Sequence, residues 1–240
     1  CFGGTTTITV SASGGTTPYA GTGNFTVSAG NYSYTITDAN GCTASTSANI
    51  SQPSILTASA TNTAVSCNGG SNGSASIAAN GGTTPYTGTG LISNLSAGSY
   101  NYTITDANGC TSIVSTTITE PSALNATTST VASTCGNPDG SLTVSANGGT
   151  GPYTYNLTGT YQPSGQFNNL TSGPYTIIVL DANGCSFTTS TTIANQASPA
   201  IAAVSSANAT CFGSNNGSAS ISAAGGTGLI QYSIDNGNTF

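Results

Sequence analysis

The sequence contains no lysine, arginine or histidine in 240 residues, and its only charged side chains are six carboxylates. A protein that binds nucleic acid neutralises phosphates with Lys and Arg, so this composition excludes nucleic acid as a partner. Catalytic triads need a histidine base, and a zinc site would lack imidazole ligands. Two carboxylates can share acid and base roles, but the sequence shows no obvious pair. We therefore expect neither an enzyme nor a cofactor.

Long apolar runs are missing too. No segment approaches the roughly 20 apolar residues of a membrane-spanning helix, so we expect no membrane insertion. The chain opens at Cys1 without a basic-then-apolar signal segment. It stops as abruptly at Phe240, which suggests a piece of a longer protein.

Strand-forming residues dominate what is present. Apolar residues make up 36% of the chain, whereas disordered proteins combine low hydrophobicity with high net charge. Thr, Val, Ile and Tyr favour strands, and Gly, Asn, Pro and Ser supply turns. We therefore expect many short strands and no helix longer than one or two turns.

Repeated motifs organise the chain. Asp-Ala-Asn-Gly-Cys occurs three times, and Gly-Gly-Thr recurs at the equivalent place of each unit, followed in three cases by Pro-Tyr. A further cysteine opens each unit. The positions are Asp38 to Cys42, Asp106 to Cys110 and Asp181 to Cys185 for the first motif, Gly14, Gly81, Gly148 and Gly225 for the second, and Cys1, Cys67, Cys135 and Cys211 for the opening cysteines. Such regular recurrence predicts tandem repeats of one small domain.

Alternation of apolar and polar residues marks the strands inside a unit. In the second unit, residues 56–61 and 74–79 alternate, and so do Tyr100, Tyr102 and Ile104. Asn108-Gly109 is a strong hairpin signal. About six or seven short strands in a unit of this size predict a β-sandwich. We therefore expect an all-β chain of tandem Ig-like (PKD/fibronectin-like) β-sandwich domains in a linear string.

Proline-containing junctions give the domain boundaries. Each follows a Thr- and Ile-rich segment and precedes a new alternating run. The expected domains are residues 1–52 (a first repeat whose first strand is missing), 53–120, 121–196 and 197–240 (a partial fourth repeat). The third is longer because extra residues fall between Tyr153 and Phe167.

The motifs resemble the SprB repeat. The shared order is Cys-x-Gly, Gly-Ser, Gly-Gly-Thr-x-Pro-Tyr, Ala-Gly-x-Tyr-x-x-Thr-Ile-x-Asp-Ala-Asn-Gly-Cys and Ile-x-x-Pro, and it covers essentially the whole chain. The third repeat departs from it at Gly173-Pro174-Tyr175, and the fourth lacks the Pro-Tyr pair. SprB repeats belong to very large cell-surface adhesins of gliding bacteria, exported by type IX secretion.

The resemblance implies an extracellular, cell-surface filament that provides cell adhesion and gliding motility. Its implied partners are the cell-envelope motility or secretion machinery and a surface or polysaccharide substratum gripped by other regions. From these features we expect a structural stalk. The alternative is a carbohydrate-binding, lectin-like module, which exposed aromatic side chains and carboxylates on one domain face would favour.

Three kinds of residue have both a functional and a structural interpretation. Asp38, Asp106 and Asp181 are weak calcium candidates, since hard cations prefer carboxylates, but an Asp-x-Asn-Gly turn also forms without metal. Tyr34, Tyr102 and Tyr175 suit a sugar-stacking platform or, more simply, core and tyrosine-corner positions. Tyr161 and Phe167 are better candidates for exposed aromatic contacts. Threonine-rich segments resemble ice-binding ladders but recur only once per domain.

Disulfides are expected to close each domain, because units of roughly 70 residues bury a limited core. Two pairings fit the spacing. Pairing within repeats joins Cys1–Cys42, Cys67–Cys110 and Cys135–Cys185, and Cys211 then pairs beyond Phe240. Pairing across junctions joins Cys42–Cys67, Cys110–Cys135 and Cys185–Cys211. We favour pairing within repeats, because the start of a domain's last strand should lie far from the next domain's first turn.

Overall fold

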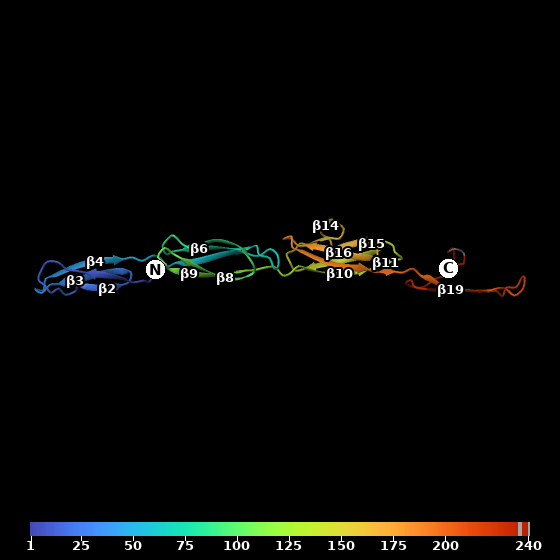
Figure 1. Ribbon diagram of the computed structural model, residues 1–240, viewed down its shortest axis with the longest axis horizontal. Coiled ribbons are helices and arrows are strands. Elements are labelled where there is room, and N and C mark those ends of the chain that lie inside the picture. The colour runs from blue at the N-terminus through green and yellow to red at the C-terminus, as the bar shows by residue number, and fades with distance from the viewer. Residues whose placement is uncertain (235–236, 240) are drawn as a thin grey trace. The chain divides into compact units, whose positions relative to one another are not determined.

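The computed structural model describes residues 1–234 and 237–239. These residues form twenty β-strands and no helix, so the predicted all-β fold of tandem Ig-like sandwiches is confirmed. No helix in the described part of the chain is able to span a membrane. The strands fall into separate groups along the chain (Figure 1), and the chain divides into two compact units between Glu120 and Pro121.

Repeat 2, residues 53–120, shows the complete sandwich. One sheet has the order β5-β6-β7, built from β5 (Thr57–Thr63), β6 (Gly73–Asn80) and β7 (Gly90–Leu95). The second sheet is the hairpin of β8 (Gly98–Thr105) and β9 (Thr111–Ile118). All neighbours are antiparallel. Each strand therefore turns one set of alternating side chains toward the facing sheet.

The core of repeat 2 follows from that alternation. Ala75 and Ile77 of β6 are buried, while Ser76 between them faces outward. Ile104 of β8 is 0% exposed and Ile118 of β9 is 1% exposed. Burying one such side chain contributes about 1.5–3 kcal/mol. These residues hold the two sheets together.

Repeat 3, residues 121–196, repeats this plan with an added hairpin. Its strands are β10 (Asn125–Val131), β11 (Ser133–Thr134), β12 (Gly140–Asn147), β13 (Thr154–Asn156), β14 (Tyr161–Gln162), β15 (Gln166–Leu170), β16 (Gly173–Leu180), β17 (Ser186–Ile193) and β18 (Asn195–Gln196). One sheet has the order β10-β12-β15 and the other β14-β13-β16-β17. The extra residues predicted from the sequence thus form β13 and β14, and β14 stands at the top of this repeat in Figure 1.

Repeats 1 and 4 contain parts of the same sandwich. In repeat 1, β1 (Thr6–Val10) pairs with β2 (Gly23–Val27), and β3 (Gly30–Thr37) pairs with β4 (Thr43–Ile50). Repeat 4 contributes β19 (Ala200–Ala207) and β20 (Ser218–Ala224), which pair with each other.

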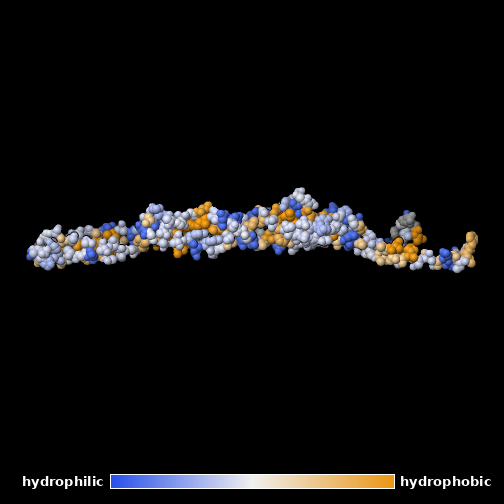
Figure 2. All heavy atoms as spheres, viewed as in Figure 1, coloured by the Kyte–Doolittle hydropathy of each residue, from blue (hydrophilic) through white to orange (hydrophobic). Residues whose placement is uncertain are grey.

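The surface is polar but nearly uncharged. Figure 2 shows repeats 1 to 3 as mostly pale spheres with scattered orange patches, in keeping with a surface of Thr, Ser and Asn. The chain has a formal net charge of −6. Its repeats therefore carry few charges that attract counterions or repel each other.

Candidate functional site

The Asp-Ala-Asn-Gly-Cys hairpin of repeat 2 is fastened to the Gly-Gly-Thr loop. Asp106 Oδ1 accepts the backbone N–H groups of Asn108 at 2.9 Å and Cys110 at 2.8 Å, and Asp106 Oδ2 accepts that of Thr83 at 2.9 Å. The Asn108 amide donates to the Thr83 hydroxyl at 2.9 Å. One carboxylate therefore closes its own turn and ties it to a loop more than twenty residues earlier. We call this arrangement the hairpin clasp.

Repeats 1 and 3 contain the same clasp. Asp38 accepts from Thr16, Asn40 and Cys42 at 3.1, 2.9 and 2.8 Å, and Asp181 accepts from Thr150, Asn183 and Cys185 at 2.9 Å each.

The loop glycine of the clasp cannot be replaced. A Cβ on Gly82 would lie 2.7 Å from Asp106 Oδ2, and the φ angle of this glycine is +62°. Both the space and the backbone conformation therefore require glycine, which explains the repeated Gly-Gly-Thr motif.

Hydrogen bonds set the protonation of these carboxylates. Burial raises the pKa of Asp106 and of Asp181, but the backbone N–H donors together lower each pKa below its ordinary value of 3.8. For Asp38, the N–H of Thr16 is the largest influence and lowers the pKa. All three clasps thus contain a carboxylate that is ionised at neutral pH and faces N–H donors.

This geometry favours the structural interpretation over the calcium interpretation. In each hairpin clasp both carboxylate oxygens accept N–H groups, whose positive ends would repel a cation. Among the described residues, no three His, Cys, Asp or Glu side chains gather in a group that would hold a metal ion.

Most tyrosine side chains form hydrogen bonds or packing contacts within their own repeat. Tyr100 donates to the carbonyl of Ser96 at 3.0 Å, and Tyr175 donates to that of Thr171 at 2.9 Å. Such a bond back to the preceding corner is the tyrosine corner of Ig-like sandwiches. Tyr102 and Tyr175 pack against the cores of their repeats. In repeat 1, the Tyr34 ring lies 4.9 Å from that of Phe25.

A second set of tyrosines closes the Gly-Gly-Thr-x-Pro-Tyr loop. Tyr86 donates to the carbonyl of Gly81 at 2.6 Å, and Tyr153 donates to that of Gly148 at 2.7 Å. These rings are half-buried, and their hydroxyl groups are engaged within the loop.

The inserted hairpin offers one exposed aromatic ring. Tyr161 is 42% exposed on β14. The expectation that Phe167 is also exposed is wrong, because Phe167 packs against the core of repeat 3 from β15. The alternation of β15, in which every second side chain faces the core, accounts for this difference.

The opening cysteine of each repeat lies in a turn at the other end of the sandwich. Glu120, the last residue of repeat 2, accepts the N–H of Gly69 at 2.6 Å. The side chain of Gln52 accepts the N–H of Gly3 at 2.8 Å in the same way. We call this arrangement the turn clasp. The turn clasp was not predicted from the sequence. A Gln or Glu directly before each of the first two junction prolines could have indicated it.

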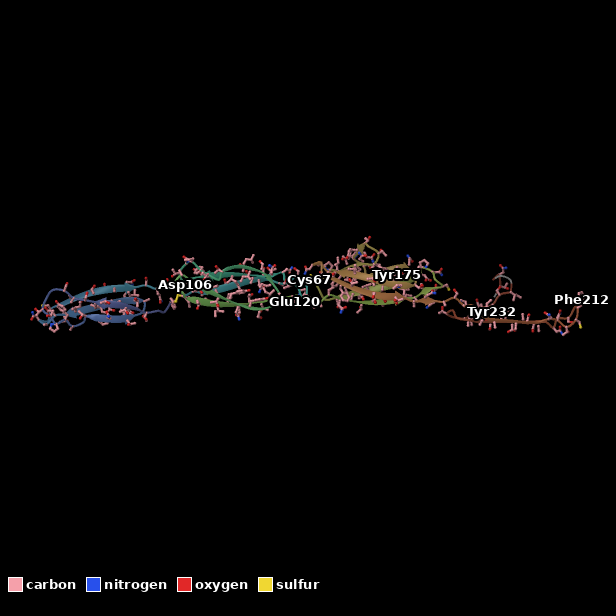
Figure 3. The ribbon with its side chains drawn as sticks, in the orientation of Figure 1. Cys67, Asp106, Glu120, Tyr175, Phe212 and Tyr232 are labelled. Atoms are coloured by element: carbon pink, nitrogen blue, oxygen red, sulfur yellow. A yellow bond between two sulfur atoms is a disulfide. The ribbon has the colours of Figure 1, made fainter. Side chains whose placement is uncertain are left out.

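The structure overturns both disulfide pairings considered from the sequence. Cys1 is bonded to Cys110, with a Cα–Cα distance of 5.3 Å, and the bond is visible beside Asp106 in Figure 3. Cys67 and Cys185 are also disulfide-bonded, whereas Cys42, Cys135 and Cys211 are exposed free thiols. The predicted bonds Cys1–Cys42, Cys67–Cys110 and Cys135–Cys185 are therefore wrong, and so is the pairing across junctions.

The cause lies in the direction of the strands. Cys67 and Glu120 lie at one end of repeat 2, and Asp106 lies at the other (Figure 3). Cys110 and Glu120 flank the eight residues of β9, which span about 25 Å. Cysteines more than about 7 Å apart at Cα cannot bond without backbone movement. Cys110 instead meets the turn cysteine of the preceding repeat.

Comparison with known families identifies the repeats. The SprB repeat family matches residues 59–87, 127–160 and 203–239. Parts of repeats 2, 3 and 4 thus match the SprB repeat family. The matched segments begin in the first strand of each repeat and include the cysteine turn and the Gly-Gly-Thr loop, and they end before the Asp-Ala-Asn-Gly-Cys hairpin.

Among solved structures, the chain is similar to the N-terminal eight Ig domains of Down Syndrome Cell Adhesion Molecule, with 13% sequence identity and a TM-score of 0.32. That alignment covers 75% of this chain and 29% of the other chain. A search of curated proteins found no match.

A groove in repeat 1 corresponds to a filled position in repeat 2. It has a volume of about 330 Å³ and is lined by residues that include Gly15, Asp38 and Cys42. In repeat 2, Leu56 fills this place: it is 8% exposed, and its Cδ1 would lie 3.2 Å from a Cβ on Gly82. The residue just before β5 thus occupies in repeat 2 the space that the groove leaves open in repeat 1.

Proposed function

We propose that this segment is a covalently reinforced structural stalk within a cell-surface adhesin. The observation that carries the proposal is the Cys1–Cys110 disulfide, which joins repeat 1 to repeat 2. The proposed domains are residues 1–52, 53–120, 121–196 and 197–240, arranged in series along the chain. Repeat proteins gain length and stability by adding units that contact their neighbours.

The side chains support a passive role. The carboxylates of the hairpin clasps are occupied by backbone N–H groups, and most tyrosine hydroxyls are engaged within their own repeats. The Asp139 carboxylate accepts the N–H and the hydroxyl of Thr134, so it too is held within its own turn. The proposal accordingly assigns the segment no catalytic activity and no cofactor.

The disulfides support a location outside the cytoplasm, because reducing systems in the cytoplasm keep thiols free. We place the protein at the extracellular face of the cell, exported by the type IX route that serves SprB-repeat adhesins. In this setting a cell-envelope motor moves the filament while distal regions grip the substratum, so that the stalk serves gliding as well as attachment.

The lectin alternative receives less support. Among the described residues only Tyr161 and Tyr232 are exposed tyrosines, and they belong to different repeats. Sugar-binding platforms combine rings with polar groups at one concave site, and a single exposed ring does not provide one.

Single-molecule stretching tests the stalk proposal. When the chain is pulled from both ends, load should pass from Cys1 to Cys110 through the disulfide, so that the 109-residue separation cannot extend. Reduction should then release up to about 380 Å of additional contour length, at about 3.5 Å per residue. The double variant Cys1→Ser/Cys110→Ser should extend further than the oxidised wild-type chain without reductant. Equal extension of the oxidised and reduced wild-type chains would contradict a load-bearing bond.

Adhesion measured on cells supplies the functional test. In the parent adhesin, removing one of these repeats should shorten reach and leave attachment intact. Loss of attachment with normal export would show a specific binding module instead and overturn the stalk proposal.

A further inference from the structure

Asparagine followed by glycine is a reactive pair, because the backbone nitrogen of the glycine has no neighbouring side chain to shield it. That nitrogen attacks the side-chain amide of the asparagine when the two groups meet. The chain has this pair in each hairpin clasp, at Asn40, Asn108 and Asn183, and also at the start of the Gly-Gly-Thr loop of repeat 2, at Asn80. The structure holds the clasp pairs and the loop pair in different ways.

The hairpin clasp occupies both reacting groups of its pair. The Asn108 amide nitrogen donates to the Thr83 hydroxyl at 2.9 Å, and the N–H of Gly109 donates to the carbonyl of Asp106 at 3.0 Å. Both groups therefore bond to other residues and not to each other. The clasps of repeats 1 and 3 have the same bonds, from Asn40 to Thr16 and Gly41 to Asp38, and from Asn183 to Thr150 and Gly184 to Asp181.

The pair at Asn80 has its two reacting groups in contact. Asn80 is exposed at the end of β6. The N–H of Gly81 donates to Oδ1 of Asn80 itself at 2.9 Å, which places the attacking nitrogen beside the amide and polarises the amide carbonyl. Groups held next to one another react faster than groups that must first meet.

The fold also requires the glycine of this pair. A Cβ on Gly81 would lie 2.0 Å from the carbonyl oxygen of Ile55, and the φ angle of Gly81 is +77°. No other residue fits this space and this backbone conformation. The unshielded nitrogen after Asn80 is therefore a consequence of the loop structure.

We propose that Asn80 is a site of spontaneous deamidation, and that the hairpin clasps protect their own asparagines from the same reaction. The Gly81 nitrogen loses its proton and bonds to Cγ of Asn80. The bond from Cγ to the side-chain nitrogen breaks, and this nitrogen leaves as ammonia. Water from the solvent then opens the resulting succinimide at either carbonyl, which gives aspartate or isoaspartate. Water is the one co-reactant, and nothing is oxidised or reduced.

The product changes repeat 2 in two ways. It adds a carboxylate to a chain of formal net charge −6 that has no Lys, Arg or His to pair with it. Isoaspartate also lengthens the backbone by one carbon directly before Gly82 and Thr83, which contact the Asp106 carboxylate. The loop then no longer matches the hairpin clasp. This inference goes beyond the stalk, because it gives repeat 2 a chemical weakening that depends on age.

The full chain incubated in mildly alkaline buffer tests the proposal. Pepsin releases peptides for mass spectrometry, since the chain has no Lys or Arg for trypsin. We expect the acid product to form about tenfold faster, or more, at Asn80 than at Asn108. Asn80→Ser should abolish it, and serine is the residue that repeat 1 has at the equivalent position, Ser13. Equal rates at Asn80 and Asn108, or a faster rate at Asn108, would overturn the proposal.

A matched variant tests the protection by the clasp. Thr83→Val removes the hydroxyl that accepts the Asn108 amide but keeps the backbone N–H that donates to Asp106. With the fold verified by circular dichroism, deamidation at Asn108 should rise and that at Asn80 should stay unchanged. An unchanged rate at Asn108 would contradict the protection. None of these outcomes affects the stretching test, which depends on Cys1 and Cys110.

Discussion

The carboxylate of Asp106 accepts the backbone N–H of Cys110 at 2.8 Å, so the cysteine that bonds to Cys1 is positioned by the acid four residues before it. The hairpin clasp and the disulfide between repeats are therefore parts of one structure. The clasp fixes one end of a repeat, and the bond attaches that end to its neighbour. The core between the sheets stabilises the repeat independently of both.

Asp106→Asn should lower the urea midpoint of repeat 2. In the wild-type chain the ionised carboxylate accepts the N–H groups of Thr83, Asn108 and Cys110. The amide of asparagine has only one oxygen acceptor, and that oxygen is neutral, so at least one of these N–H groups loses its acceptor. Glu120→Gln is the control, since it keeps an acceptor for Gly69 and should shift the midpoint less. Equal midpoints for Asp106→Asn and wild type would contradict the structural role of the clasp.

Stability should be nearly constant from pH 5 to pH 7 and fall under acid conditions. The pKa of each clasp carboxylate is lowered in the folded state. The stabilisation is therefore complete above the ordinary Asp value of 3.8 and is lost as pH falls through the lower folded-state pKa. Circular dichroism along a pH titration, with urea unfolding at each step, measures this. Loss of stability between pH 7 and pH 5 would contradict it, because the chain has no histidine.

Ile104→Ala should destabilise repeat 2 by about 2–5 kcal/mol, the usual cost of truncating a buried Ile. Ile104 is 0% exposed between the sheets. Ile113→Ala on β9 is the matched control, because Ile113 is 68% exposed and its change should stay within about 0.5 kcal/mol. Urea unfolding of both variants measures the difference. Similar losses would show that the assigned inner face is wrong.

Two neighbouring tyrosines should respond differently to loss of their hydroxyl groups. Tyr100→Phe removes a hydrogen bond to the carbonyl of Ser96 and should cost about 1 kcal/mol. The hydroxyl of Tyr102 is buried without a hydrogen-bond partner among the described residues, so Tyr102→Phe should leave stability unchanged or raise it by up to about 1 kcal/mol. Thermal unfolding compares the two. A larger loss of stability for Tyr102→Phe than for Tyr100→Phe would contradict this assignment of hydrogen bonds to the two hydroxyl groups.

Local signals in the sequence predicted much of the fold. Alternation placed β5, β6 and β8, and Asn108-Gly109 marked the hairpin between β8 and β9. The Pro-containing junctions lie between the strand groups, and Tyr175 was correctly expected at a core or corner position. These features depend on period-two patterns and turn chemistry, which act over a few residues.

The cysteine pairing depended on a property of the whole repeat. Three strands, β6, β7 and β8, lie between Cys67 and Cys110, and each reverses the direction of the chain. An odd number of reversals leaves the two cysteines at opposite ends of the sandwich. Spacing alone does not show this, whereas the number of strands between the two cysteines is enough to exclude pairing within a repeat.

The turn clasp was not predicted from the sequence for a related reason. Glu120 and Gly69 are separated by 51 residues, and only the completed sandwich brings them together. Whether Phe167 faces the core depends on the register of β15 against β12. The inserted hairpin makes this register hard to predict from the sequence.

The bond between Cys1 and Cys110 has a further consequence for a protein exposed to extracellular proteases. Cutting any single peptide bond between these two residues yields fragments that remain joined through sulfur. A nick in an exposed loop, such as the one between β6 and β7, would therefore leave the chain unsevered. Damage would break the polymer only where a second cut or a reductant followed the first.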